Sequence, residues 1–110
     1  MVTITLDHGG AVHSGAAVGS RDERDRPRLV GEAALRAVES LTGGRVDLEL
    51  LAIATAAIGD SRVAVAQVRL NPYHETLVGS ALLRDEDAGG SWAAARAVMD
   101  ALNRRLGTEI

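Results

Sequence analysis

Residues 46–84, VDLELLAIATAAIGDSRVAVAQVRLNPYHETLVGSALLR, contain three apolar runs separated by two turn signals. The first turn is Gly-Asp at residues 59–60, and the second is Asn-Pro-Tyr-His at residues 71–74. Short turns of this kind join neighbouring antiparallel strands. We therefore predict strands at residues 46–58, 62–70 and 75–84.

Two further segments have the apolar spacing of amphipathic helices. The first covers residues 28–41, begins just after Pro27 and ends at Gly43-Gly44. The second covers residues 91–106, with Ser91 as its N-cap. These start and stop residues are the ones that helix ends favour.

The beginning of the chain reads as a hairpin, with strands at residues 2–7 and 11–18 around a His-Gly-Gly turn. The predicted order is β-β-α-β-β-β-α. We therefore predict an α+β fold in which an antiparallel sheet carries two helices on one face. The length of 110 residues suits a single domain over residues 1–110.

A faint internal repeat divides the domain into halves of about 1–43 and 46–107. One fixed offset in residue number places Leu6 on Leu70, Gly15 on Gly79 and Ala17 on Ala81; Asp7 falls on Asn71. In the helices, an offset smaller by four superimposes residues 36–38 and 96–98, which both read Arg-Ala-Val. Each half would then be a hairpin followed by a helix.

The composition excludes several classes of protein. Apolar residues make up 46% of the chain, and the net charge is only −3, which argues against disorder. No apolar run approaches the length of a membrane span, and the first residues alternate like a strand rather than a signal peptide. The absence of cysteine excludes disulfides and thiol chemistry. We expect a cytoplasmic protein that does not bind membranes.

The predicted strands are apolar on both faces, although helices can cover only one. Aromatic residues are only 2% of the chain, so the apolar positions hold mainly Ala, Val, Leu and Ile. An antiparallel sheet with a solvated face normally alternates with polar residues. We therefore expect a homodimer in which a second copy covers the outer face.

The candidate chemistry is sparse. His8, His13 and His74 match no zinc-ligand spacing, so we predict no metal site and no cofactor. No nucleophile elbow, catalytic triad or phosphate-binding loop is present, and we assign no catalytic residue. A chain without recognisable catalytic groups is more typical of a binding or assembly domain than of an enzyme.

A small ligand could bind where the two strand-to-helix loops meet the helix N-termini, because free backbone N–H groups lie there. The candidate ligand-binding residues at these junctions are Gly19, Ser20, Asp85, Asp87 and Ser91. The principal alternative is a small homodimeric α+β enzyme with a site at its interface, using carboxylates such as Asp85 or Asp87.

A third interpretation is a domain that binds double-stranded RNA, because residues 28–106 have the element order of that fold. The charge opposes it. The chain is net acidic and contains no Lys, and phosphate contacts need a basic surface. We therefore do not expect nucleic acid as a partner.

From residue 46 onward the chain resembles the C-terminal regulatory (LeuA dimerisation) domain of 2-isopropylmalate and citramalate synthases. The similar features are Val-Asp-Leu-Glu-Leu-Leu at residues 46–51, the Gly-Asp turn, the acidic loop at residues 85–87 and Ala-Leu-Asn-Arg at residues 101–104. The resemblance implies two strand-and-helix repeats, a dimer, and an amino acid or related effector near the interface. Residues 19–27 differ from the glycine-rich effector segment of that family.

Overall fold

The computed structural model describes residues 2–8, 10–17, 26–71, 74–84 and 91–106. It has the α+β class and the element order β-β-α-β-β-β-α that the sequence predicts. The elements are β1 (Val2–His8), β2 (Ala11–Ala17), α1 (Arg26–Leu41), β3 (Asp47–Ile58), β4 (Ser61–Asn71), β5 (Glu75–Leu82) and α2 (Ser91–Leu106). In these residues neither helix is both long and apolar enough to span a membrane.

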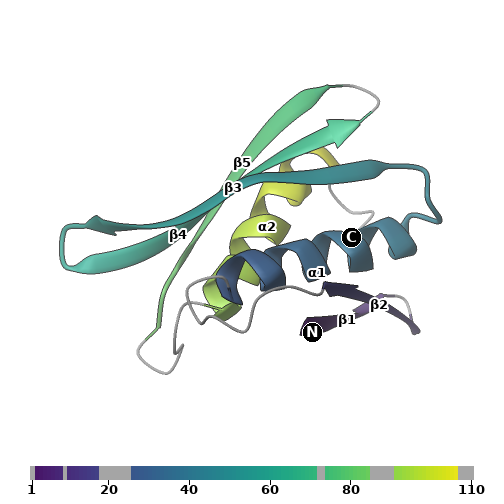
Figure 1. The fold of residues 1–110 in the computed structure, drawn as a ribbon, viewed down its shortest axis with the longest axis horizontal. Coiled ribbons are helices and arrows are strands. Elements are labelled where there is room, and N and C mark those ends of the chain that lie inside the picture. Colours follow the sequence, from purple (N-terminus) through teal and green to yellow (C-terminus); the bar gives the residue numbers. More distant parts are fainter. Residues whose placement is uncertain (1, 9, 18–25, 72–73, 85–90, 107–110) are drawn as a thin grey trace.

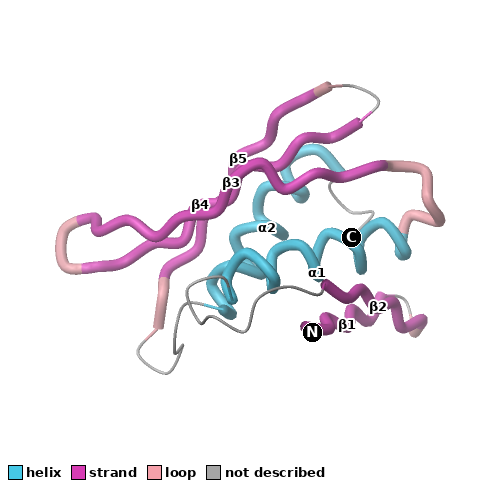
Figure 2. Tube along the Cα trace, viewed as in Figure 1, coloured by secondary structure: helices cyan, strands magenta, loops and turns pink. Residues whose placement is uncertain are grey.

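The strands form two antiparallel sheets, whereas the sequence pattern predicts one. The larger sheet has the order β3-β4-β5 and carries both helices on one face, as expected (Figures 1 and 2). The β1–β2 hairpin packs against α1 from the opposite side, so the helices lie between two layers of strands (Figure 1). The packing of the hairpin on α1 supplies the burial that a two-stranded sheet needs for stability.

A β-bulge at Leu51 changes which positions of β3 face the helices. The ladder with β4 pairs Leu50 with Val68 and then Ala52 with Gln67, which leaves Leu51 as the extra residue. Because side chains alternate along a strand, an extra residue reverses the facing of every position after it. Leu50 therefore points toward the helices before the bulge, and Ile53 points toward them after it.

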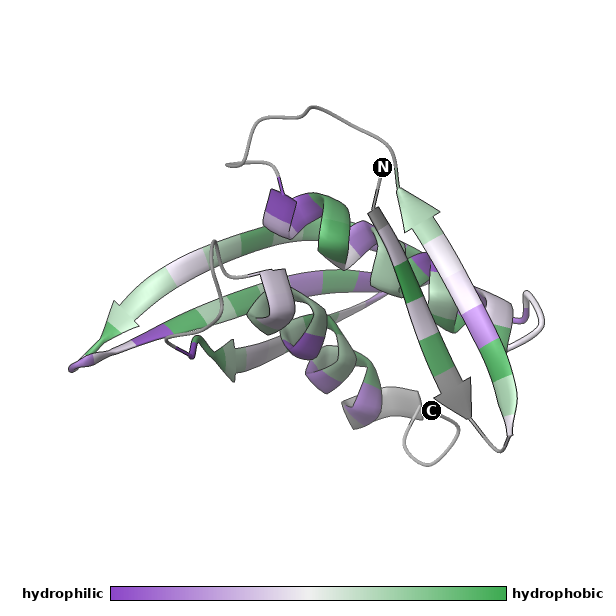
Figure 3. Cartoon of the chain, turned by 90° about the horizontal axis from the view of Figure 1, so that it is seen from below, coloured by the Kyte–Doolittle hydropathy of each residue, from purple (hydrophilic) through white to green (hydrophobic). Residues whose placement is uncertain are grey.

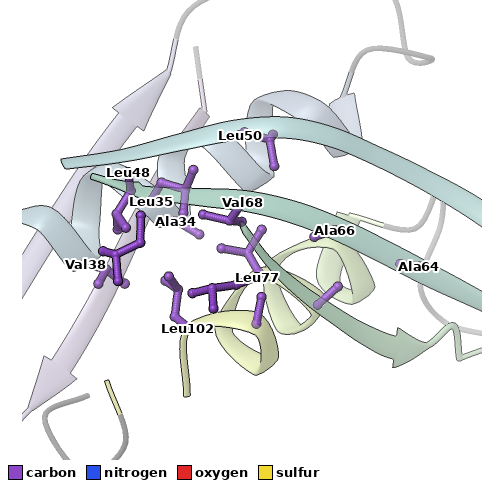
Figure 4. Packing of buried hydrophobic residues seen from close by; sticks show 14 of the residues in the cluster. Ala34, Leu35, Val38, Leu48, Leu50, Ala64, Ala66, Val68, Leu77 and Leu102 are labelled. Atoms are coloured by element: carbon purple, nitrogen blue, oxygen red, sulfur yellow. The ribbon is translucent and has the colours of Figure 1, made fainter. Parts of the chain in front are cut away.

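The core between the three-stranded sheet and the helices consists of small and medium aliphatic side chains (Figure 4). Its largest fully buried side chains are Leu35, Leu48, Leu70, Leu102, Val38, Val68 and Val98. Alanines fill the closest contacts: Ala33 and Ala37 on α1 and Ala97 and Ala101 on α2 are all fully buried. The scarcity of aromatic residues therefore corresponds to thin, closely spaced layers.

Two glycines set the distance between strands and helices. A Cβ on Gly15 of β2 would collide with the backbone of Ala33 and Ala37 in α1. A Cβ on Gly79 of β5 would collide with the backbone of Ala97 and Ala101 in α2. Each helix therefore approaches its strand as closely as only glycine permits.

These contacts correct the alignment of the two halves. Gly15, Ala33 and Ala37 match Gly79, Ala97 and Ala101 at one constant offset in residue number, which is the offset predicted for the strands. The smaller offset predicted for the helices is wrong. It superimposes the two Arg-Ala-Val segments, but the residues that it matches do not make equivalent contacts with the strands.

The first strand also differs from the predicted alignment. Ile4 faces Gly15 across the first hairpin, and Ala66 faces Gly79 across the second. Ile4 therefore corresponds to Ala66, and the predicted match of Leu6 with Leu70 is displaced by two. The cause is the turn length, since the second hairpin has a longer loop.

Candidate functional site

The outer face of the three-stranded sheet, away from the helices, is apolar over one end. We define the apolar outer patch as the outward apolar side chains at this end: Ala52, Ala54, Ala56, Ile58, Val63, Val65, Val78 and Leu82. The register places Ala56, Val63 and Leu82 in one row across the three strands. The patch is thus one continuous surface rather than scattered residues.

The patch contains most of the large apolar side chains that the described residues expose. Ile58 is 63% exposed, Leu82 59% and Val78 50%. Monomeric proteins rarely leave large contiguous apolar patches in water, and such patches mark interfaces. The other end of the same face is polar, with Glu49 and Arg69 in an ion pair at 4.0 Å. This arrangement of an apolar centre beside a charged edge is typical of protein–protein interfaces.

At Leu48 and Leu50, the outer edge of β3 is hydrogen-bonded by side chains of α1. Glu39 accepts a hydrogen bond from the backbone N–H of Leu48 at 2.8 Å. Arg36 donates to the carbonyl of Leu48 and forms an ion pair with Glu39 at 3.1 Å. Arg28 donates to the carbonyl of Leu50 at 3.5 Å. A sheet edge with satisfied backbone groups is protected from further strand pairing.

The edge of β5 is bonded in a similar way by α2. Asp100 accepts a hydrogen bond from the backbone N–H of Ser80 at 3.0 Å, and Arg96 donates to the carbonyl of Leu82 at 2.7 Å. The sequence pattern predicts that these charged side chains lie on the solvent-exposed face of α2. Only the tertiary placement of each helix beside a sheet edge reveals their role.

A groove separates β1 from α2, on the side of the helix layer opposite the larger sheet. It is lined by residues 3–6 of β1 and has a volume of about 570 Å³. Its α2 side consists of Trp92, Ala95, Arg96, Met99, Asp100 and Asn103. We call this cavity the β1–α2 groove. Figure 3 shows β1 between α2 and β2, with its apolar residues interspersed with polar ones.

Of the candidate ligand-binding residues, only Ser91 lies in the described part of the chain. Gly19, Ser20, Asp85 and Asp87 fall outside the described residues. Ser91 is the first residue of α2, but its Oγ is buried without a hydrogen-bond partner, so it does not form the capping bond expected of an N-cap serine. A buried hydroxyl without a partner is costly, so this atom is suited to a polar contact from a ligand or a neighbouring loop.

The described histidines do not assemble into a metal site. His74 is exposed in the turn before β5, where it adopts a positive φ of 54°, and His13 lies on β2. Among the described residues no cluster of three or more His, Cys, Asp or Glu side chains could hold a metal ion.

Comparison with protein-family models, with curated proteins and with solved structures found no match for this chain. The functional assignment therefore rests on the surfaces and contacts described above.

Proposed function

We propose that this chain is a non-catalytic assembly and regulatory domain that pairs with a second copy through the apolar outer patch. The observation that carries the proposal is the exposure of Ile58, Val78 and Leu82 on one face of a sheet whose other face is already covered by the helices. Covering such a patch removes apolar surface from water, which contributes about 25 cal/mol for each Å² buried.

A second copy is the simplest cover because the patch is nearly self-complementary in chemistry. Its apolar side chains are Ala, Val, Leu and Ile, and the outward polar side chains among them, Ser80 and Gln67, are uncharged. An isologous interface places the same patch on both subunits, and small aliphatic side chains can interdigitate across it. Two sheets packed face to face in this way would form an ordinary sandwich core.

The regulatory part of the proposal rests on the resemblance to the LeuA dimerisation domain. By this proposal, an amino acid or a related small acid binds near the N-terminus of α2, close to Ser91. The unpartnered Oγ of Ser91 supports a polar ligand at this position. The dipole of a helix favours a carboxylate near its N-terminus.

The dimer is tested by substituting the patch with charge. Leu82→Asp and Val78→Asp should each convert a dimer into a monomer in analytical ultracentrifugation, because a carboxylate cannot be buried against a second apolar sheet. Val12→Asp is the matched control, since Val12 is 66% exposed on β2, away from the patch. A dimer that survives both patch substitutions, or one that only Val12→Asp disrupts, would contradict the proposal.

A further inference from the structure

Among the described residues, the first half of the fold has two strands where the second half has three. In the second half, Ala66 of β4 lies between Gly79 of β5 and Ile53 of β3. Its counterpart Ile4 lies beside Gly15 of β2, and among the described strands β1 has no partner on its other side. The vacant position, the counterpart of β3, coincides with the β1–α2 groove.

The helix faces at these two positions correspond residue by residue. In α1, Gly31 is covered by Leu50 and Ile53 of β3, and Arg28, Arg36 and Glu39 contact the same strand. The offset that superimposes the two glycine contacts also matches residues of α1 with residues of α2. Gly31 corresponds to Ala95, and Arg28, Arg36 and Glu39 correspond in that order to Trp92, Asp100 and Asn103. All four of these α2 residues line the groove. The groove is therefore the surface that β3 covers in the other half.

Burial confirms that this part of α2 is uncovered. Gly31 and Leu35 of α1 are buried, and Leu35 is 0% exposed. Their counterparts Ala95 and Met99 are only partly buried. Trp92, the single tryptophan of the chain, is 67% exposed at the end of the groove. An exposed tryptophan beside an apolar groove is characteristic of a protein-binding hot spot.

The groove also offers backbone pairing. The edge of β1 presents alternating N–H and C=O groups over residues 3–6, beside the apolar side chains of α2. Asn103 stands where Glu39 bonds the backbone of Leu48 in the other half, and its amide can both donate and accept. A strand placed here would find main-chain partners on one side and apolar contacts beneath, which is the chemistry of strand addition.

We propose that the β1–α2 groove binds an extended β-strand of another protein, with aliphatic residues at the positions that face α2. This inference goes beyond the proposed dimer, which uses the opposite side of the molecule. The occupant must present an unpaired backbone edge together with apolar side chains. In a second copy the described strands hold their inner faces against their own helices, except at the tip of the β3–β4 hairpin. Their outer faces form the apolar outer patch, which the proposed dimer covers. A separate extended segment therefore fits better than a second copy.

The pattern of β3 defines the probe. A synthetic peptide with the sequence of Asp47–Ile58 and flanking lysines carries Leu48, Leu50 and Ile53, which share the helix-facing side when the strand adopts the bulge at Leu51. The peptide contains no tryptophan, so the emission of Trp92 reports on binding without interference from the probe. Titration into the full chain should shift the Trp92 emission to shorter wavelength in a saturable manner.

Two controls separate strand addition from non-specific adsorption. A peptide carrying Leu50→Asp and Ile53→Asp should bind at least tenfold more weakly. The full-chain variant Ala95→Glu should weaken the binding of the unaltered peptide by a similar factor. If Ala95→Glu does not fold, Met99→Glu replaces it in this test. Val12→Asp should bind as the unmodified chain does.

The proposal is overturned if the emission does not change, if the two peptides bind equally, or if neither groove variant alters binding. It is also overturned if Trp92 emission shifts with protein concentration in the absence of peptide and Ala95→Glu abolishes that shift. That result would assign the groove to a second copy.

Discussion

Gly15 and Gly79 occupy the same place in the two halves of the chain, each pressed against the backbone of a helix. Gly15 lies over Ala33 and Ala37, and Gly79 lies over Ala97 and Ala101. Because glycine and both alanines are displaced by the same number of positions, these contacts are the clearest evidence for an internal repeat. They also show that both strand–helix contacts depend on the absence of a side chain.

The first prediction concerns this close approach. Gly79→Ala should lower the free energy of unfolding by about 3 kcal/mol or more, because the new Cβ meets helix backbone that cannot move aside easily. Gly15→Ala should be destabilising for the same reason. Urea denaturation followed by circular dichroism measures both effects.

Gly31→Ala is the matched control, since Gly31 also lies at a helix contact. Its Cβ would meet the side-chain end of Leu50 at 3.2 Å, which can shift, and alanine favours the helix by about 1 kcal/mol. The net change in the free energy of unfolding should therefore stay within about 1 kcal/mol. Equal losses for all three glycines would show that the backbone contacts are not special.

The second prediction concerns the edge of β3. Glu39→Met should lower the free energy of unfolding by about 1–3 kcal/mol, because it leaves the backbone N–H of Leu48 without its acceptor. Hydrogen exchange at the Leu48 amide should accelerate in the same variant. Glu49→Met, which removes an exposed carboxylate 4.0 Å from Arg69, should cost less than about 1 kcal/mol. An unchanged exchange rate at Leu48 would refute the capping role of Glu39.

The third prediction concerns the proposed effector. Branched-chain amino acids, 2-oxo acids or 2-hydroxy acids should raise the melting temperature of the chain, because a ligand that binds only the folded state stabilises it. Ser91→Ala should reduce the shift if its buried hydroxyl contacts the ligand. A thermal-shift screen in which none of these compounds stabilises the chain would remove the regulatory part of the proposal.

The fourth prediction addresses the RNA interpretation. The chain should not bind duplex RNA at physiological salt, because it is net acidic and has no lysine. An electrophoretic mobility assay at several salt concentrations measures this directly. Binding that weakens steeply as salt rises would contradict the assembly interpretation.

The sequence predicts the helices and strands of this fold closely, because turn residues and apolar spacing are local signals. Both helices and all five strands lie within a few residues of their predicted ranges. The separation into two sheets was not predictable, since the pattern of a strand does not show which strand lies beside it. The bulge at Leu51 likewise depends on the partner strand.

The candidate site was predictable only in part. The doubly apolar strands pointed to the outer patch, where Val78 and Leu82 are indeed exposed. The hydrogen bonds of Arg36 and Glu39 to β3 were not predictable, because charged residues on a helix usually face solvent. The groove was missed for a different reason: Trp92 and Met99 have the spacing of the buried stripe of α2, and only the vacant strand position exposes them.

The most direct test of the central claim is the mass of the unmodified chain in solution, measured by light scattering over a range of concentrations. Pairing through the apolar outer patch predicts a particle with twice the 11.5 kDa mass of one chain. A constant mass of 11.5 kDa at every concentration would contradict it.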